Sequence, residues 1–423
     1  METDTMTAIP DRLVQEISGG RCVAFVGAGM VMPVVPGWEA LLCDLSEQAS
    51  AATAQQVREL VAGGSSRHLE AAAQALKDDI GPDFESELKT RLESLDEGPV
   101  VEQRLRLLRE IPFRAILTTN FDPFLGGVEP GPEAYLTVLR PPHRPWWALE
   151  RNWQRADHKD DHVVKLHGSV QGDVGTVVFT LRDYRSRLYH EPGYLTFLKS
   201  VFATSTVLYL GVSFTDAYLN EVRSEILALL GHQPAAEPMA YAVLPDVTAG
   251  QAAHLLHHEA IEVIPYTTDA DGGHGGFDDI LGAVHAATDP FHKLGRIVNG
   301  RRIVWLDPTS ENNVFGVQLL KEGLQSMDGR ASVIEVGTVE EALKTIKTGA
   351  DLVITHWGWR REPGSTAEDL LQSMRSEDLR APVLVFSQEE QAAERKPIAL
   401  GLGAADYTYT WESLVGAIER VLG

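Results

Sequence analysis

Short apolar runs alternate with amphipathic segments along most of the chain, and this alternation restricts the fold more than any other feature. The runs are rich in β-branched and aromatic residues, and the segments between them carry apolar residues at helical spacing. Such alternation predicts a parallel α/β architecture. In the first part, the predicted strands are Cys22–Val26, Ala115–Thr118, His162–Leu166, Thr176–Thr180, Thr206–Leu210, Tyr241–Leu244 and Glu262–Pro265. The predicted helices there are Trp38–Ser50, Tyr194–Ala203, Asp216–Leu230, Ala249–His258 and Phe277–Ala287.

Two stretches of the chain interrupt this alternation of strand and helix patterns, and they indicate the domain organisation. The stretch from Ala51 to Leu108 carries helical patterns and no strand, which predicts a helical insert after the first βα unit. The stretch DPFHKLGRIVNG interrupts the pattern again. We therefore predict a first domain over residues 1–290, a linker over 291–300 and a second domain over 301–423. A chain of 423 residues is long enough for two or three domains of about 150 residues each.

The second domain repeats the alternation with greater regularity. Five βα units in this stretch predict a flavodoxin-like, five-stranded, doubly wound sheet. Its predicted strands are Ile303–Leu306, Ser332–Val336, Asp351–Thr355, Pro382–Phe386 and Asp406–Tyr407. Its predicted helices are Asn313–Met327, Val339–Thr348, Ala367–Ser376, Glu389–Leu400 and Trp411–Leu422.

The net charge and the number of cysteines limit the kinds of partner that the protein can bind and the cellular compartment in which we expect it. A net charge of −23 opposes non-specific binding to nucleic acid or to an anionic membrane. Two cysteines, Cys22 and Cys43, are too few for a disulfide framework, and no CxxC motif occurs. The N-terminus lacks a secretory apolar region, and no apolar run is long enough to span a bilayer. We expect a cytoplasmic protein.

Glycines follow the first predicted strand in the sequence CVAFVGAG. Gly27 and Gly29, on either side of Ala28, would let the backbone approach a pyrophosphate, whose charge the loop amides can stabilise. The full dinucleotide motif GxGxxG needs a third glycine where Met32 stands, which disfavours an ordinary Rossmann dehydrogenase. A tight strand-to-helix turn explains the same glycines equally well.

Polar residues follow three further predicted strands. Asn120 and Asp122 follow the second strand, His167 follows the third, and Gly211 and Ser213 follow the strand ending at Leu210. The carboxyl ends of parallel strands are where open α/β sheets bind ligands. Each residue has a simpler explanation as well: turn formation for the Asn and Asp, a core or loop position for the His, and an N-cap after Ser213. Their joint occurrence at one sheet edge favours a site.

In these motifs the sequence resembles the sirtuin family of NAD-consuming proteins, especially the bacterial sirtuin-like proteins of antiphage defence. The resemblance covers about Arg21 to Tyr266. It rests on the motifs GAG, PGW, TTNFD, LHG, DY and GVSFTDAYL. It implies a Rossmann-like domain that takes NAD+ as its substrate.

The resemblance also implies a role for each residue. Gly27, Ala28 and Gly29 would hold the pyrophosphate, and Gly211 and Ser213 would contact the adenosine side or a phosphate. Asn120 and Asp122 would lie beside the nicotinamide ribose, with Asn120 positioning the attacking water. His167 would be the general base, for which an imidazole pKa near neutrality is suited.

Two departures from the family pattern shape the expected activity. Protein-deacylating sirtuins carry a zinc module with four cysteines, which this chain lacks, so we expect no zinc and favour NAD+ hydrolysis to nicotinamide and ADP-ribose. Val31 stands where the family has a serine, which removes a hydroxyl near the phosphates. The alternatives are a non-enzymatic sensor of NAD or ADP-ribose, and an NAD-dependent deacylase or ADP-ribosyltransferase.

The second domain resembles a response-regulator receiver. The matches are IVWLDP, DLVITH, APVLVFS and GAADYTYT. A working receiver needs an acidic pair, an acceptor aspartate and a lysine, but here Pro308 follows Asp307, His356 stands at the acceptor position and Tyr409 at the lysine position. Ser387 matches its counterpart. We expect a pseudo-receiver that regulates the enzyme or assembles it into a homo-oligomer, in response to a nucleotide signal or to a phage or partner protein. The loop HWGWRR predicts either packed tryptophans or a nucleotide-binding surface.

Overall fold

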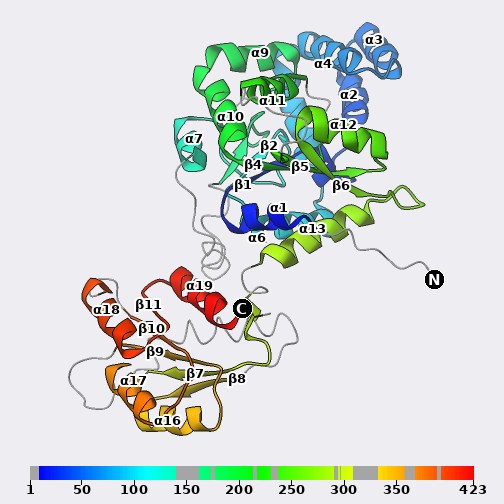
Figure 1. Ribbon diagram of the computed structural model, residues 1–423. Coiled ribbons are helices and arrows are strands. Elements are labelled where there is room, and N and C mark those ends of the chain that lie inside the picture. The colour runs from blue at the N-terminus through cyan, green and yellow to red at the C-terminus, as the bar shows by residue number, and fades with distance from the viewer. Residues whose placement is uncertain are drawn as a thin grey trace. The chain divides into compact units, whose positions relative to one another are not determined.

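The computed structural model describes residues 9–139, 162–172, 177–212, 217–229, 237–289, 294–295, 297–307, 332–357, 367–387 and 392–423. The chain divides into two compact units, with the division between His285 and Ala286 (Figure 1). The predicted domain boundary near residue 290 remains a prediction. No helix in the described ranges combines the length and the apolar character needed to cross a membrane.

The first unit is built on a six-stranded parallel sheet in the order β3-β2-β1-β4-β5-β6. This is the Rossmann-type order, in which the direction of winding reverses between β1 and β4. The strands are β1 (Cys22–Val26), β2 (Ala115–Thr118), β3 (Val163–Lys165), β4 (Thr206–Leu210), β5 (Ala240–Pro245) and β6 (Ile261–Tyr266). The predicted fold class of this unit is confirmed.

The strand predicted at Thr176–Thr180 is wrong over its described residues 177–180, which form no strand. The apolar run has another cause. The ring of Phe179 packs against Trp38 and Phe84, with ring centroids 4.6 and 4.8 Å apart. Thr180 forms the N-cap of the next helix in a capping box with Asp183. Burial in an aromatic cluster therefore produced a pattern that resembles a strand.

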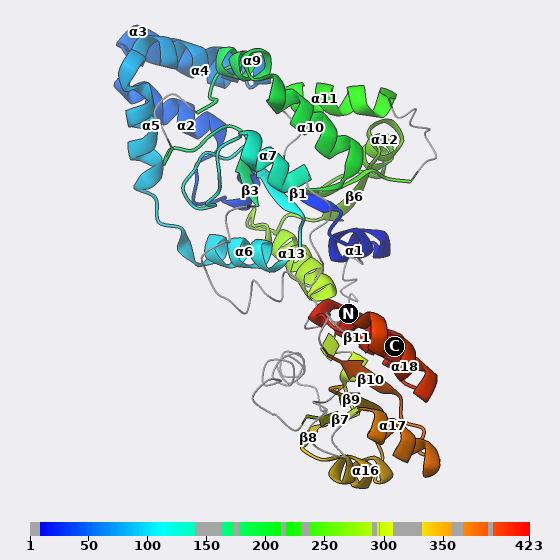
Figure 2. The same ribbon diagram turned by 90° about the vertical axis from the view of Figure 1, so that its left-hand side faces the viewer.

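Helices cover both faces of this sheet, as Figures 1 and 2 show. Alternate residues of the fully buried β1 enter two different cores: Ala24 contributes to one and Phe25 to the other. The first core includes α1, α6 and α13, and the second includes α7, α10 and α11. The helices of the first unit are α1 (Asp11–Ser18), α2 (Trp38–Leu45), α3 (Ala51–Ala62), α4 (Ser66–Ile80), α5 (Phe84–Glu93), α6 (Gly98–Glu110), α7 (Pro132–Leu139), α9 (Leu181–His190), α10 (Pro192–Thr204), α11 (Ala217–Leu229), α12 (Ala249–Glu259) and α13 (Gly275–Thr288). Short 3-10 turns lie at η1 (Ala28–Met30), η2 (Ser46–Gln48) and η3 (Gly81–Asp83).

Between β1 and β2 the described chain is entirely helical or irregular, as the sequence predicted. The predicted insert, Ala51 to Leu108, contains α3, α4, α5 and most of α6, and it buries apolar residues such as Val57, Leu76 and Leu88 in the core of the first unit. The insert therefore packs on the sheet domain as part of one core.

The second unit holds a five-stranded parallel sheet in the order β11-β10-β9-β7-β8, which is the flavodoxin-like order that the sequence predicted. Its strands are β7 (Arg302–Leu306), β8 (Ser332–Val336), β9 (Leu352–Thr355), β10 (Val383–Phe386) and β11 (Asp406–Thr408). Its described helices are α16 (Val339–Lys347), α17 (Ala367–Ser376), α18 (Ala392–Leu402) and α19 (Trp411–Leu422). The predicted helix Asn313–Met327 lies outside the described residues.

The region between the units contains two features that the sequence did not predict. Helix α13 continues to Thr288, past the division at His285. Leu294 and Val298, in the segment expected to be a linker, are fully buried in the core of the second unit. The core of the second unit therefore includes residues that precede Arg301.

Candidate functional site

The loops that follow β1 and β4 pack directly against each other through their backbones. The Gly27 amide donates to the Leu210 carbonyl (2.9 Å), and the Gly29 amide donates to the Gly211 carbonyl (2.9 Å). A Cβ atom on Gly27 would lie 2.5 Å from the Gly211 oxygen, and a Cβ atom on Gly211 would lie 2.5 Å from the Met30 nitrogen. The glycines are therefore required by this close approach, at the point of the sheet where Rossmann-type folds bind ligands.

Asn120 orients the outermost peptide of the loop after β1. Its side-chain Nδ2 donates to the Gly27 carbonyl (3.1 Å), and the Met30 amide donates to the same oxygen (3.1 Å). Because the carbonyl and the N–H of one trans peptide point in opposite directions, the Ala28 N–H must point away from Asn120. Ala28 is exposed, and its amide has no acceptor among the described residues. The loop thus presents a free backbone donor at the switch point, which suits an anion such as a pyrophosphate.

A chain of hydrogen bonds holds Asn120 in this position. The Thr118 hydroxyl donates to the Val26 carbonyl (2.9 Å), and the Asn120 amide donates to the Thr118 hydroxyl (3.0 Å). Asn120 itself is 7% exposed. Nδ2 is occupied by the loop, and the side-chain oxygen accepts no hydrogen bond from the residues that the structure describes, so it can accept one from a ligand or a water molecule.

Asp122 is buried in the turn that follows β2. It is 3% exposed, and its Oδ1 accepts a hydrogen bond from the Phe124 amide (3.1 Å), as in an Asx turn. Burial raises the pKa of Asp122, and the nearby Lys165 opposes that rise. The turn interpretation explains these contacts fully, and the predicted contact with the nicotinamide ribose stays a prediction.

Lys165 is a buried cation that sequence reasoning missed. It is 2% exposed, and its Nζ donates to the carbonyls of Asp122 and of Leu125 (3.0 Å). Its presence among the apolar residues of VVKL was the available signal, because a lysine in a buried strand needs acceptors. Lys165 fixes the end of the loop that carries Asn120.

His167 follows β3, and its loop is joined to the loop of Asn120. The Leu166 amide donates to the Thr118 carbonyl (2.7 Å), and the Val170 amide donates to the Phe121 carbonyl (3.0 Å). Since β2 and β3 are neighbours in the sheet, the two predicted catalytic residues lie at the carboxyl ends of adjacent strands. The sheet therefore brings Asn120 and His167 to the same edge.

The expected near-neutral pKa of His167 is not what the structure gives. Burial, together with the positive charge of Arg187, lowers the pKa of His167 to about 3. The imidazole ring packs edge-on against Tyr184, with ring centroids 5.5 Å apart. His167 is consequently neutral throughout the physiological pH range, which is the protonation state that a base requires.

Of the remaining predicted site residues, Gly211 lies at the switch point and Ser213 lies outside the described residues. Asp183, from the DY motif, has a structural role. It completes the capping box of α9 by accepting a hydrogen bond from the Thr180 amide, and it also accepts one from Lys77 of α4 (2.8 Å). Tyr184, from the same motif, contacts the ring of His167.

In the second unit, three polar residues lie after neighbouring strands: Asp307 after β7, His356 after β9 and Ser387 after β10. The Ser387 hydroxyl lies 3.5 Å from His356 Nε2. Burial lowers the pKa of His356, and Asp307 opposes this effect. Trp357 is buried, and its ring centroid lies 6.1 Å from that of Tyr407, so the packing interpretation holds for this tryptophan. Residues 358–361 of the same loop lie outside the described residues.

The sheet order, with the glycine loop at its switch point, defines the first unit as a Rossmann-type domain. Residues 114–264 match the family model described as a SIR2-like domain. The chain is 27% identical over 231 residues to the NAD(+) hydrolase ThsA of Enterococcus faecium. That match covers 51% of this chain and 42% of the relative, so the chain spans less than half of the length of that protein. The resemblance to sirtuin-like proteins is thereby confirmed.

Solved structures of response regulators are similar to part of this chain. One is the receiver domain of a Francisella response regulator, with 20% identity, a TM-score of 0.24 and coverage of 29% of this chain and 96% of that one. Another is a LuxR-family DNA-binding response regulator from Staphylococcus aureus, with 19% identity, a TM-score of 0.25 and coverage of 29% and 99%. The flavodoxin-like fold of the second unit follows from its own strand order.

Proposed function

We propose that this chain is an NAD+ hydrolase that cleaves the nicotinamide–ribose bond. NAD+ and water would give ADP-ribose, nicotinamide and a proton. The observation that carries the proposal is the contact between Asn120 and the glycine loop, because it joins a candidate water-binding amide to a candidate pyrophosphate site at one sheet edge. The similarity to an NAD(+) hydrolase supports the same reaction.

The chemistry fits the residues at this edge. Breaking the N-glycosidic bond builds positive charge on the ribose, as in other glycoside cleavages that pass through a cation-like transition state. Such a cation is a strong electrophile, so an oriented water molecule can attack it before losing its proton. A weak base is then sufficient, which is consistent with a His167 pKa of about 3. We assign Asn120 to hold the water and His167 to accept its proton.

The proposal is tested by nicotinamide release from NAD+ by the full chain. We expect the wild type to release nicotinamide and His167→Ala to lower kcat/KM by about 10²-fold, the lower end of the contribution of a general base. His254→Ala, on an exposed position of α12, is the matched control and should keep the wild-type rate. Because His167 stays neutral, the wild-type kcat/KM should not fall as the pH is lowered from 8 to 5. A base with the ordinary pKa of about 6.5 would become protonated over that range, and kcat/KM would fall. Equal rates for wild type and His167→Ala would contradict the assignment.

We further propose that the second unit lowers the activity of the enzyme without abolishing it, since an NAD+ hydrolase that is always fully active would kill its host. The biological role would be depletion of NAD+ in an infected bacterial cell, and an unchanged NAD+ content after infection would argue against it.

A chain ending at Asp289 keeps α13 whole. We expect this chain to differ from the full chain in oligomeric state and to cleave NAD+ about tenfold faster without a trigger, within the usual range of allosteric coupling. Identical assembly and rate, measured by sedimentation and nicotinamide release on folded protein, would refute the regulatory role.

A further inference from the structure

Arg104, on α6, is a buried cation directed at the loop that follows β1. Its side chain is 5% exposed. Its Nη1 donates to the Met32 carbonyl (2.7 Å) and to the Gly29 carbonyl (3.4 Å). Both acceptors belong to the loop whose outer corner is Ala28. Arg104 therefore holds the buried side of this loop while its exposed side stays free for a ligand.

Asp278 makes this buried charge tolerable. Arg104 Nε and Nη2 donate to the two carboxylate oxygens of Asp278 on α13, at 2.5 and 3.0 Å. This two-pronged ion pair offsets the cost of removing the guanidinium from water, and it leaves the third nitrogen for the loop carbonyls. The guanidinium also lies 5.2 Å from the centroid of the Phe277 ring. The loop is thus connected to α13 through one side chain of α6.

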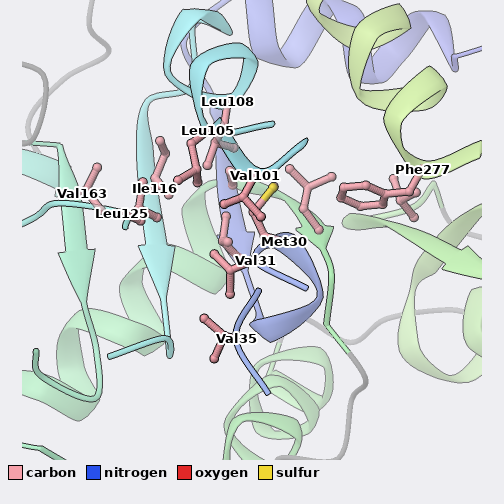
Figure 3. Packing of buried hydrophobic residues seen from close by; sticks show 14 of the residues in the cluster. Met30, Val31, Val35, Val101, Leu105, Leu108, Ile116, Leu125, Val163 and Phe277 are labelled. Carbon is pink, nitrogen blue, oxygen red and sulfur yellow. The ribbon is translucent and has the colours of Figure 1, made fainter. Parts of the chain in front are cut away.

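Apolar side chains of the loop also hold it in place on its buried side, where Arg104 lies. Met30 and Val31 are buried against α6, close to Val101, with Phe277 in the same cluster (Figure 3). Val31 stands at the position where the resemblance leads one to expect a serine. In this chain the position therefore serves to anchor the loop, and Arg104 supplies the polar contacts to the loop from inside the protein.

We propose that Arg104 is a positioning residue for NAD+: it fixes the peptides from Gly29 to Met32 so that the Ala28 amide faces the pyrophosphate. This proposal rests on the proposed function for its ligand. Within the part of the chain that the structure describes, the hydrogen bonds of Arg104 go to the Gly29 and Met32 carbonyls and to Asp278, and none goes to the residues assigned to the water. Its loss should therefore weaken binding of the dinucleotide and leave the bond-breaking step nearly unchanged.

The test compares Arg104→Met with Arg223→Met in the full chain. Arg223 is a matched control, because it is similarly buried and pairs with Glu259 (2.7 Å) on the far side of the sheet from α6 and α13. We expect Arg104→Met to raise KM for NAD+ about tenfold or more, with kcat changed less than about threefold, as for a lost charged hydrogen bond that acts on binding. Arg104→Lys, which keeps the charge, should recover part of the affinity. Arg223→Met should lower the melting temperature and leave KM unchanged.

A second readout does not depend on NAD+ cleavage. The amides of Met30 and Val31 are bonded within the loop to the carbonyls of Gly27 and Ala28. Their hydrogen exchange should become at least about tenfold faster in Arg104→Met and stay unchanged in Arg223→Met. If the wild type releases no nicotinamide, the proposed function fails, but the exchange data still decide whether Arg104 holds the loop. Unchanged exchange, or an unchanged KM in an active Arg104→Met, overturns the proposal.

Discussion

Replacing Asn120 by alanine is expected to lower the rate of nicotinamide release by about 10³-fold, because one side chain serves two purposes. Its Nδ2 holds the Gly27 carbonyl and so directs the Ala28 amide outward, and its oxygen is the group assigned to the attacking water. Removing the side chain would disorder the pyrophosphate site and release the water together. The measurement is single-turnover nicotinamide release, with NAD+ binding followed separately by calorimetry.

Two further variants make this result interpretable. Asn120→Asp keeps the size and an acceptor oxygen but cannot donate to the Gly27 carbonyl, so we expect it to bind NAD+ about tenfold more weakly as well as to lose activity. Ser46→Ala removes another buried side-chain hydrogen bond, to the Cys43 carbonyl (2.6 Å), away from the strand ends. It should keep the wild-type rate. An Asn120→Asp enzyme that binds NAD+ normally would show that the contact with Gly27 is irrelevant to binding.

Replacing Gly211 by alanine is expected to cause the largest loss of stability among the single substitutions considered. Its φ of +63° lies in the left-handed region, and the added Cβ would lie 2.5 Å from the Met30 nitrogen and 2.7 Å from the Gly29 carbonyl carbon. Left-handed strain and overpacking together cost about 3 kcal/mol. Because the clash pushes on the glycine loop itself, NAD+ binding should be lost as well. Exchange of the β1 and β4 amides and NAD+ calorimetry measure the two effects.

Gly272→Ala is the matched control for this prediction. Gly272 has a φ of +83°, but a Cβ atom there would meet nothing within 4 Å. It should cost about 1 kcal/mol from backbone strain alone and leave NAD+ binding intact. Similar effects of the two substitutions would mean that the contact between the two loops is not tight.

The parallel sheets were predictable because a strand buried on both faces leaves a plain signal. β1 appears in the sequence as an uninterrupted apolar run, β4 appears as four apolar residues after Thr206, and the predicted bounds of both match the structure. The run ending at Thr180 shows the limit of that signal. Val177, Val178 and Phe179 are buried outside the sheet, and composition alone does not distinguish burial in an aromatic cluster from burial in a strand.

The strand-end residues of the candidate site were predictable for the same reason, since topology places every such residue at one edge. Arg104 was not predictable. In the amphipathic segment of α6 it looks like Arg106 and Arg109, and its partner Asp278 lies 174 positions further along the chain. Only the three-dimensional packing distinguishes the buried arginine from its neighbours.

Helix α13 determines where the first unit must end if it is to fold when joined to a different C-terminal domain. The division between the compact units falls at His285, inside a helix that runs to Thr288. The same helix carries Asp278, and its His285 Nε2 lies 3.1 Å from Glu110 of α6. A fusion protein in which the first unit ends at His285 would lack the final turn of α13. One in which it ends before Gly275 would also lack Asp278, so the buried Arg104 would have no counter-charge. Where related proteins carry a different C-terminal domain after this first unit, we therefore expect the whole of α13 to remain with the first unit.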